Sequence, residues 1–206
     1  MIFKNKLLDN QDQFRMHYTD PEFHLNMLNR FLALLPPTPR EYVVVSIGTD
    51  RSTGDALGPL VGSLFSEKKP RHISVYGTLD NPVHAVNLQD YLHQIETSYR
   101  HPFIIAIDAC LGKQHSVGKI IAGKGPIKPG AALNKPLPAI GDAHLTGVVN
   151  VSGFMEYAVL QNTRLQIVMA MAKLIADLLD EVDQRLTYRK RMPAVVSTTI
   201  SKSFSL

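Results

Sequence analysis

Apolar residues recur along the chain first at helical and then at strand spacing. Asp20-Pro21-Glu22 offers an N-cap, a first-turn proline and a first-turn acid. The apolar positions that follow at helical spacing are Leu25, Leu28, Phe31, Leu32 and Leu35. This pattern predicts a helix over residues 20–35 that ends at Pro36-Pro37. Residues 42–47 form a near-continuous β-branched run, which predicts a strand covered on both faces.

The alternation of helix and strand patterns continues toward the C-terminus. The further predicted elements are a helix at 56–65, a strand at 72–76, a helix from Pro82 to Ile95, strands at 103–107, 117–122 and 148–151, and a long helix at 168–182. Residues 123–141 hold four prolines and four glycines and are predicted to be a loop.

Strands that alternate with helices favour right-handed crossovers. We therefore predict an α/β fold, a three-layer sandwich with a mostly parallel central sheet and helices on both faces. Residues 1–188 are expected to form one domain, because no break in composition divides the chain, and residues 189–206 a basic, flexible tail. In such sheets functional groups collect beyond the carboxyl ends of the strands.

Composition narrows the classes of protein to consider. Of the 206 residues, 45% are apolar and 19% charged, as in ordinary folded proteins. The single cysteine, Cys110, cannot form an internal disulfide, and no signal peptide or run of membrane-spanning length is visible. We expect a cytoplasmic protein without a membrane partner. Four of the 22 basic residues lie in the tail, so the rest of the chain carries 18 charges of each sign, and no specific nucleic-acid partner is expected.

The glycine-bearing loop after the first central strand contains Asp50, Arg51, Thr53 and Asp55. Its backbone amides could hold an anion, although the loop lacks both the Walker ending and the dinucleotide glycine spacing. Taken alone, Asp55 is better explained as a helix N-cap than as a catalytic acid. Arg51 could bind a substrate carboxylate, but an exposed loop cation or a partner for Asp50 is the simpler interpretation.

Asp108 directly follows five apolar residues at the predicted end of a buried strand. A carboxyl group there needs partners, which are either loop amides or groups of an active site. Two acids at the ends of neighbouring strands can share a water, one kept protonated by burial and like charge while the other acts as a base. Asp55 and Asp108 could also bind a divalent metal through oxygen ligands.

Other candidate residues have simpler structural explanations. His84 is expected in the first turn of a helix and His144 in an exposed loop, and a surface role is favoured for both. Cys110 is interpreted as a small apolar residue rather than a nucleophile, because no histidine or cation is adjacent in sequence. Ser52 and Thr53 are expected to form hydrogen bonds within their loop, since no serine-hydrolase elbow surrounds them.

Four segments together resemble the YyaC family of sporulation proteins, which is similar to the germination protease of spore-forming bacteria. They are Ser46-Ile47-Gly48-Thr49-Asp50-Arg51-Ser52-Thr53-Gly54-Asp55-Ala56-Leu57-Gly58-Pro59, Gly77-Thr78-Leu79-Asp80-Asn81-Pro82-Val83-His84-Ala85, Ile107-Asp108-Ala109-Cys110-Leu111-Gly112 and Thr146-Gly147-Val148-Val149-Asn150. The resemblance covers residues 42–180. It implies a phosphorylase/hydrolase-like fold similar to that of hydrogenase maturation proteases, with a peptidase-like site built on two aspartates.

The resemblance implies Asp55 and Asp108 as the catalytic residues of an endopeptidase-like hydrolase. Asp50, Arg51, Thr53 and His84 are predicted to contact the substrate. No cofactor is required for this chemistry, but a divalent metal is an open alternative, held by His144 with the two acids. The substrate would be a sporulation or germination protein, such as a small acid-soluble spore protein, in the cytoplasm of a forespore or mother cell. The competing hypotheses are a non-catalytic sporulation factor that binds a peptide or small anion in the same cleft, and a nucleoside- or phosphate-binding protein.

Overall fold

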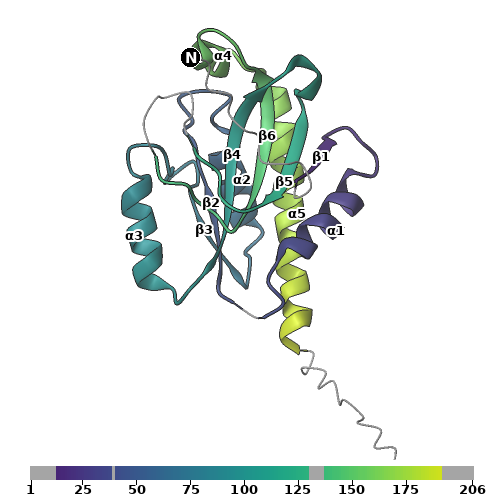
Figure 1. The fold of residues 1–206 in the computed structure, drawn as a ribbon, viewed down its shortest axis with the longest axis vertical. Helices are drawn as coiled ribbons and strands as arrows, with labels where there is room; N and C mark the ends of the chain where they lie inside the picture. The colour runs from purple at the N-terminus through teal and green to yellow at the C-terminus, as the bar shows by residue number, and fades with distance from the viewer. Residues whose placement is uncertain (1–12, 39, 130–136, 192–206) are drawn as a thin grey trace, which may run out of the picture.

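A six-stranded mixed sheet with helices on both faces forms the body of the protein (Figure 1). The structure, a computed structural model, describes residues 13–38, 40–129 and 137–191, with side chains as far as Leu186. The strands are β1 (Gln13–His17), β2 (Tyr42–Ser46), β3 (Ile73–Tyr76), β4 (Phe103–Gly112), β5 (Lys119–Lys124) and β6 (Ala143–Val151). The helices are α1 (Phe23–Leu34), α2 (Leu57–Glu67), α3 (Leu88–Ser98), α4 (Glu156–Gln161) and α5 (Leu165–Arg191), with one 3₁₀ turn at Gln114–Ser116. The predicted α/β architecture is confirmed.

The strand order in the sheet is β1-β5-β6-β4-β2-β3. Strands β3, β2, β4 and β6 run parallel to one another, whereas β5 is antiparallel to both β6 and β1. The parallel part of the sheet has its strands covered by helices, as crossover connections require. The antiparallel edge made by β5 and β1 is the part that makes the sheet mixed.

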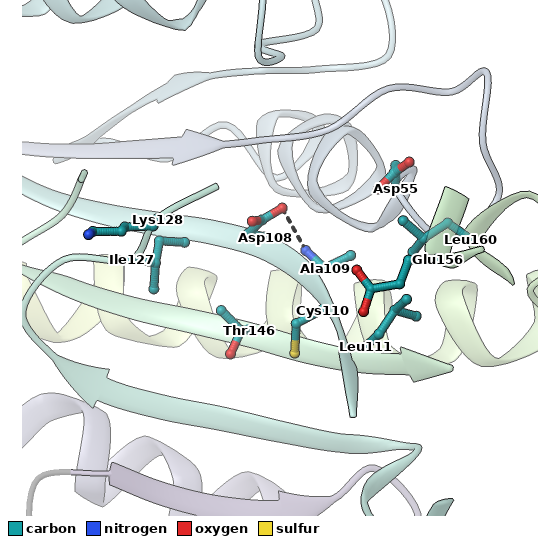
Figure 2. Close-up of a pocket in the computed structure, with 10 residues that line it drawn as sticks. All are labelled: Asp55, Asp108, Ala109, Cys110, Leu111, Ile127, Lys128, Thr146, Glu156 and Leu160. Carbon is teal, nitrogen blue, oxygen red and sulfur yellow. Dashed lines mark hydrogen bonds between the residues drawn. The ribbon is translucent and has the colours of Figure 1, made fainter. Parts of the chain in front are cut away.

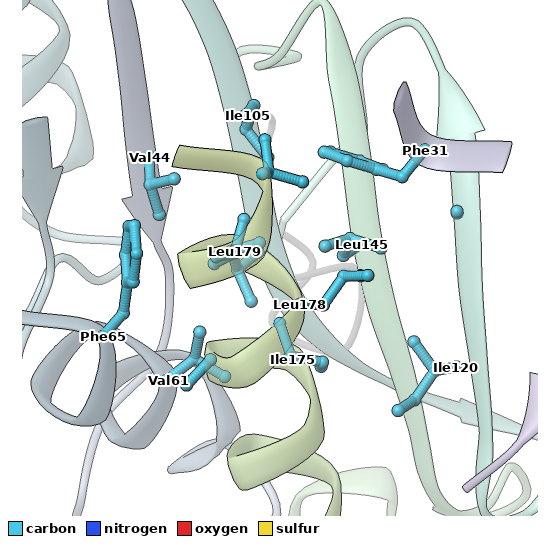
Figure 3. Close-up of a cluster of buried hydrophobic side chains, with 14 of the residues drawn as sticks. Phe31, Val44, Val61, Phe65, Ile105, Ile120, Leu145, Ile175, Leu178 and Leu179 are labelled. Carbon is cyan, nitrogen blue, oxygen red and sulfur yellow. The ribbon is translucent and has the colours of Figure 1, made fainter. Parts of the chain in front are cut away.

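The larger hydrophobic core lies between the sheet and helices α1, α2 and α5. Figure 3 shows Ile175, Leu178 and Leu179 of α5 beside strand residues such as Ile105 and Leu145, all of them buried. A smaller cluster on the other face joins β2 and β4 to α3, with Val43, Val45 and Ile95 fully buried. Burial of an aliphatic side chain of this kind contributes roughly 1.5–3 kcal/mol, so the two clusters fix the sheet between its helices.

A close approach of α2 to the end of β2 fixes the loop that carries Asp55. A Cβ atom on Gly58 would lie 2.1 Å from the Ile47 carbonyl oxygen, and one on Gly48 would lie 1.9 Å from the Asp55 carbonyl oxygen. Gly48 also has φ +148°. Only glycine permits both contacts, so the loop folds back tightly against the end of the strand.

Several sequence-based boundaries are wrong for identifiable reasons. The helix expected from Pro82 begins only at Leu88, because Asn87 closes a turn by accepting a hydrogen bond from His84 N at 2.8 Å and donating to the Pro82 carbonyl at 3.0 Å. Helix α1 begins at Phe23, after a turn in which Asp20 Oδ1 accepts from Glu22 N at 2.9 Å.

The sequence pattern also missed two elements. Strand β1 has only Phe14 and Met16 as apolar residues facing the core, too few to form a recognisable alternation. Helix α4 has six residues, below the length at which periodicity is informative. Helix α5 extends to Arg191, and the rest of the predicted tail lies outside the described residues. Among the described helices, none combines the length and apolar character needed to cross a membrane.

Candidate active site

A pocket of about 340 Å³ lies where β2 ends and β4 continues. Figure 2 shows the two predicted acids in its wall, Asp108 on β4 and Asp55 on the loop before α2. The lining residues are Asp55, Asp108, Ala109, Cys110, Leu111, Ile127, Lys128, Thr146, Glu156 and Leu160. The pocket therefore lies at the edge of the sheet where an α/β fold places its functional groups.

Asp55 lies in the turn that leads into α2 and does not cap this helix. The N-cap residue is Ala56, and no side chain makes the capping hydrogen bond. The helix-cap interpretation of Asp55 is therefore wrong. Burial raises the pKa of the Asp55 carboxyl, and the nearby Ser52 hydroxyl partly opposes this. Ser52 is itself buried, and its Oγ atom is not at full hydrogen-bonding geometry with any described residue.

Asp108 lies within β4 rather than after its end. The prediction failed because the polar side chain suggests a strand end, whereas β6 pairs with β4 as far as Gly112. The Oδ1 atom of Asp108 accepts a hydrogen bond from Ala109 N at 2.9 Å. The pKa of Asp108 is raised to about 8: burial raises it most, the hydrogen bond from Ala109 N lowers it, and the negative charge of Asp55 raises it.

The two carboxyl groups differ in their surroundings. At neutral pH Asp108 holds its proton, since its pKa is about 8. The pKa of Asp55 is also raised, but its carboxyl retains a hydroxyl neighbour that favours the ionised form. A protonated and an ionised carboxyl facing one pocket can serve as general acid and general base at the same time.

The four residues predicted to contact the substrate do not line this pocket. Asp50 and Arg51 are exposed at the outer turn of the loop, and Thr53 is partly exposed. His84 lies in the turn before α3, where its Nδ1 atom accepts from Val86 N at 3.3 Å, and not in a helical first turn as expected.

His144 is a buried residue of β6, so its assignment to an exposed loop is wrong. Its ring packs over the backbone of Gly123, where an added Cβ atom would lie 2.5 Å from the ring. Its Nδ1 atom is 2.9 Å from the Gly125 carbonyl oxygen, and burial lowers its pKa. His144 does not line the pocket, and the described residues contain no group of three His, Cys, Asp or Glu side chains able to hold a metal ion. The metal set of His144, Asp55 and Asp108 is therefore not assembled in this structure.

Sequence reasoning missed several residues of the pocket wall. Glu156 is the first residue of α4, and Figure 2 shows its carboxyl group turned toward β4. No sequence signal marked it, because it follows the irregular segment that ends in Met155, whose φ is +61°. Cys110 also lines the pocket, but burial raises the pKa of its thiol to about 11. A thiol of this kind is a poor nucleophile at neutral pH.

Comparisons with known proteins agree with the fold and with the segments that suggested it. Residues 15–178 match the model of a family described as "Protein of unknown function (DUF1256)". The chain is 56% identical over 142 residues, 69% of each chain, to the uncharacterized protein YyaC of Bacillus subtilis (strain 168). A similar solved structure is the NiFe hydrogenase maturation protease HycI from Thermococcus kodakarensis KOD1, with TM-score 0.50, 16% identity, and coverage of 71% of this chain and 95% of that one. This likeness shows that the two proteins share an α/β fold.

Proposed function

The chain belongs to the DUF1256 family, and from its pocket we propose that it is an endopeptidase-like hydrolase with Asp55 and Asp108 as its catalytic residues. One observation carries this proposal. Two carboxyl groups line a single pocket, and burial raises the pKa of one of them, Asp108, to about 8. Hydrolysis by an aspartate pair needs one protonated carboxyl group, and Asp108 supplies it.

In the proposed reaction, the Asp55 carboxylate takes a proton from a water molecule as the water oxygen attacks the scissile carbonyl carbon. Asp108 donates its proton to the carbonyl oxygen, so a neutral tetrahedral diol forms. The C–N bond then breaks, Asp55 passes its proton to the departing amine, and one diol hydroxyl returns a proton to Asp108. The products are a carboxylic acid and an amine, and both aspartates recover their starting states.

We propose a protein processed during sporulation or germination as the substrate, such as a small acid-soluble spore protein, in the forespore or mother-cell cytoplasm. The resemblance to the YyaC family supports the link to sporulation, and the fold shared with a maturation protease supports a protein substrate. The pocket is suited to a peptide substrate, because backbone of strand β4 forms part of its wall (Figure 2).

The direct test is proteolysis. Purified protein would be incubated with an extract of sporulating cells and with small acid-soluble spore proteins, and new N-termini would be identified by mass spectrometry. We expect new termini with the wild type and with Asp50→Asn, an exposed acid outside the pocket, and none with Asp55→Asn. If Asp55→Asn leaves the cleavage pattern and the sporulation phenotype unchanged, the peptidase proposal fails. If that variant loses the phenotype although the wild type cleaves nothing, the non-catalytic binding hypothesis is favoured.

The pH dependence of kcat/KM provides a separate prediction. Activity should rise with pH as Asp55 ionises and should fall above about pH 8 as Asp108 loses its proton. The alkaline decline should approach tenfold per pH unit. Rates on a fluorogenic peptide between pH 4 and 10 would measure it. Cys110→Ala serves as the control: if the alkaline limb disappears in this variant, the thiol and not Asp108 causes it.

A further inference from the structure

Strand β4 extends beyond the end of its neighbour β2. The last residue of β2, Ser46, pairs with Ile107, whereas β4 continues to Gly112 with only β6 beside it. The β2-facing edge of Ala109–Leu111 therefore has no partner strand among the described residues. This short open edge forms part of the pocket wall.

The backbone groups at this edge can be assigned from the bonds around it. The Ile107 carbonyl accepts from Ile47 N at 2.7 Å and so faces β2, while the Gly112 carbonyl accepts from Ser152 N at 2.8 Å on the β6 side. Successive residues of a strand direct their backbone groups to opposite neighbours. The irregularity between β4 and β6 places the extra residue on β6, between Val148 and Asn150, and leaves the alternation of β4 intact.

Ala109 and Leu111 therefore direct their backbone groups toward the open side. The Ala109 N–H already donates to Asp108 Oδ1. No described residue pairs with the Ala109 carbonyl or with the two backbone groups of Leu111 on this side, so these three groups are available to a ligand. The Ala109 N–H, which would bond to β2 if that strand were longer, donates to the Asp108 carboxyl group instead. This carboxyl group therefore lies where the pairing of β2 with β4 ends.

The residues that surround the open edge of β4 favour a flexible polypeptide segment as the ligand. Asp55 and residues of α4, Glu156 and Leu160, line the same pocket (Figure 2). Helix α4 and the Asp55 loop are joined by a hydrogen bond from Gly54 N to the Leu160 carbonyl at 2.9 Å. The open edge is only three residues long and lies between the Asp55 loop and α4. One extended segment fits there, whereas the edge strand of another folded sheet does not.

We propose that an extended segment of the substrate protein binds as an added β-strand along Ala109–Leu111, so that its backbone lies beside the carboxyl group of Asp108. This inference rests on the proposed peptidase function, and it defines the substrate class as an unfolded or flexible segment read mainly through its backbone. Unpaired strand edges accept such segments readily, because each added residue supplies matching donors and acceptors. The fixed register would hold one scissile bond next to the acid pair.

The test uses the full chain carrying Asp55→Asn, so that binding is measured without turnover. The probe is a set of overlapping peptides from reduced, carboxymethylated α-lactalbumin, a chain that cannot fold, and the tightest binder is remade with one N-methyl group at each successive position. We expect N-methylation at two positions separated by one residue to weaken binding about tenfold or more, with the position between changed less than about twofold, because alternate amides face β4. An effect without this alternation, or no peptide binding at all, overturns the inference.

A pair of protein variants provides an independent measurement. Leu111→Pro removes the N–H on the open edge, whereas Leu111→Ala removes most of the side chain and keeps the N–H. We expect peptide binding to fall about tenfold more in the proline variant than in the alanine variant. If the proline variant does not fold, the N-methyl series decides. The wild type could instead be a dimer that Leu111→Pro converts to a monomer while peptide binding stays unchanged. That result would show that the edge pairs with a second copy of the chain, and it would overturn the inference.

The two proposals can fail separately. Cleavage by the wild type without the alternating N-methyl pattern leaves the peptidase function in place and removes strand addition. The alternating pattern without any cleavage leaves strand addition in place and removes the peptidase function.

Discussion

Asp108→Asn should slow hydrolysis severely and at the same time stabilise the folded protein. The amide cannot donate the carboxyl proton, so we expect kcat/KM to fall about a thousandfold, within the range for loss of a general acid. The amide oxygen can still accept the hydrogen bond from Ala109 N, so the local backbone should be retained. A steady-state assay on any substrate found by the N-terminal mapping would measure the loss.

The stabilisation follows from the raised pKa of Asp108. This pKa is about 8 in the folded protein against an ordinary value of 3.8, so between these values the folded state binds more protons than the unfolded state. The wild type therefore loses stability as pH rises through this window, and above about pH 8 the full cost of the buried charge is present. Asparagine carries no charge and avoids that cost.

We expect the free energy of unfolding of Asp108→Asn to exceed that of the wild type by an amount that grows with pH. The two proteins should be similar near pH 4, and the difference should reach a plateau on the order of 3 kcal/mol above pH 8, a value reduced for the partial exposure of Asp108. Urea denaturation at a series of pH values would measure it. Asp50→Asn, at an exposed position, should change stability by less than about 0.5 kcal/mol. A destabilised Asp108→Asn protein at pH 9 would show that Asp108 is ionised and well paired in the fold.

Much of the fold could be predicted from the sequence because its central elements have strong, simple patterns. Strand β2 is a nearly continuous run of buried apolar residues, and helix α5 buries apolar residues at helical spacing. The segments predicted from these two patterns overlap the observed strand and helix. The sites of failure are those where tertiary contacts override the local pattern. His144 suggested a loop because polar and small residues precede it, yet Gly123 on the facing strand leaves room for the ring inside the sheet.

The candidate site was predictable only in part. Asp108 is conspicuous in sequence, since it follows five apolar residues, and the structure places it in the wall of a pocket. Asp55 depended on the resemblance, because its local context suggested a helix cap. Glu156 had no signal at all, since it reaches the pocket through the irregular turn at Met155 and the short helix that follows. Whether a distant residue such as Glu156 reaches the pocket depends on the tertiary path of the chain, and the spacing of apolar residues does not contain this information.

Asp183→Ala should strongly destabilise the fold, although Asp183 lies outside the hydrophobic core. Asp183 lies on α5 and is only 4% exposed, and its carboxyl oxygens accept from three successive backbone amides at the start of β3. The distances are 2.9 Å from Arg71 N, 2.8 Å from His72 N and 3.0 Å from Ile73 N. One side chain therefore fastens the C-terminal half of α5 to an edge strand of the sheet.

Removing this carboxyl group leaves three amides without their acceptor, and the amide of Ile73 is buried. Hydrogen bonds to a charged acceptor contribute about 1.5–3 kcal/mol each, and they do not add fully when they share one group. We therefore expect Asp183→Ala to lower the free energy of unfolding by about 4 kcal/mol, measured by urea denaturation. Asp177→Ala is the matched control, because Asp177 lies on the same helix and its ion pair with Lys68 at 2.8 Å is half exposed. Such pairs contribute less than about 1 kcal/mol, so similar losses in the two variants would show that the three amides find water instead, and that α5 is held to β3 by apolar packing alone.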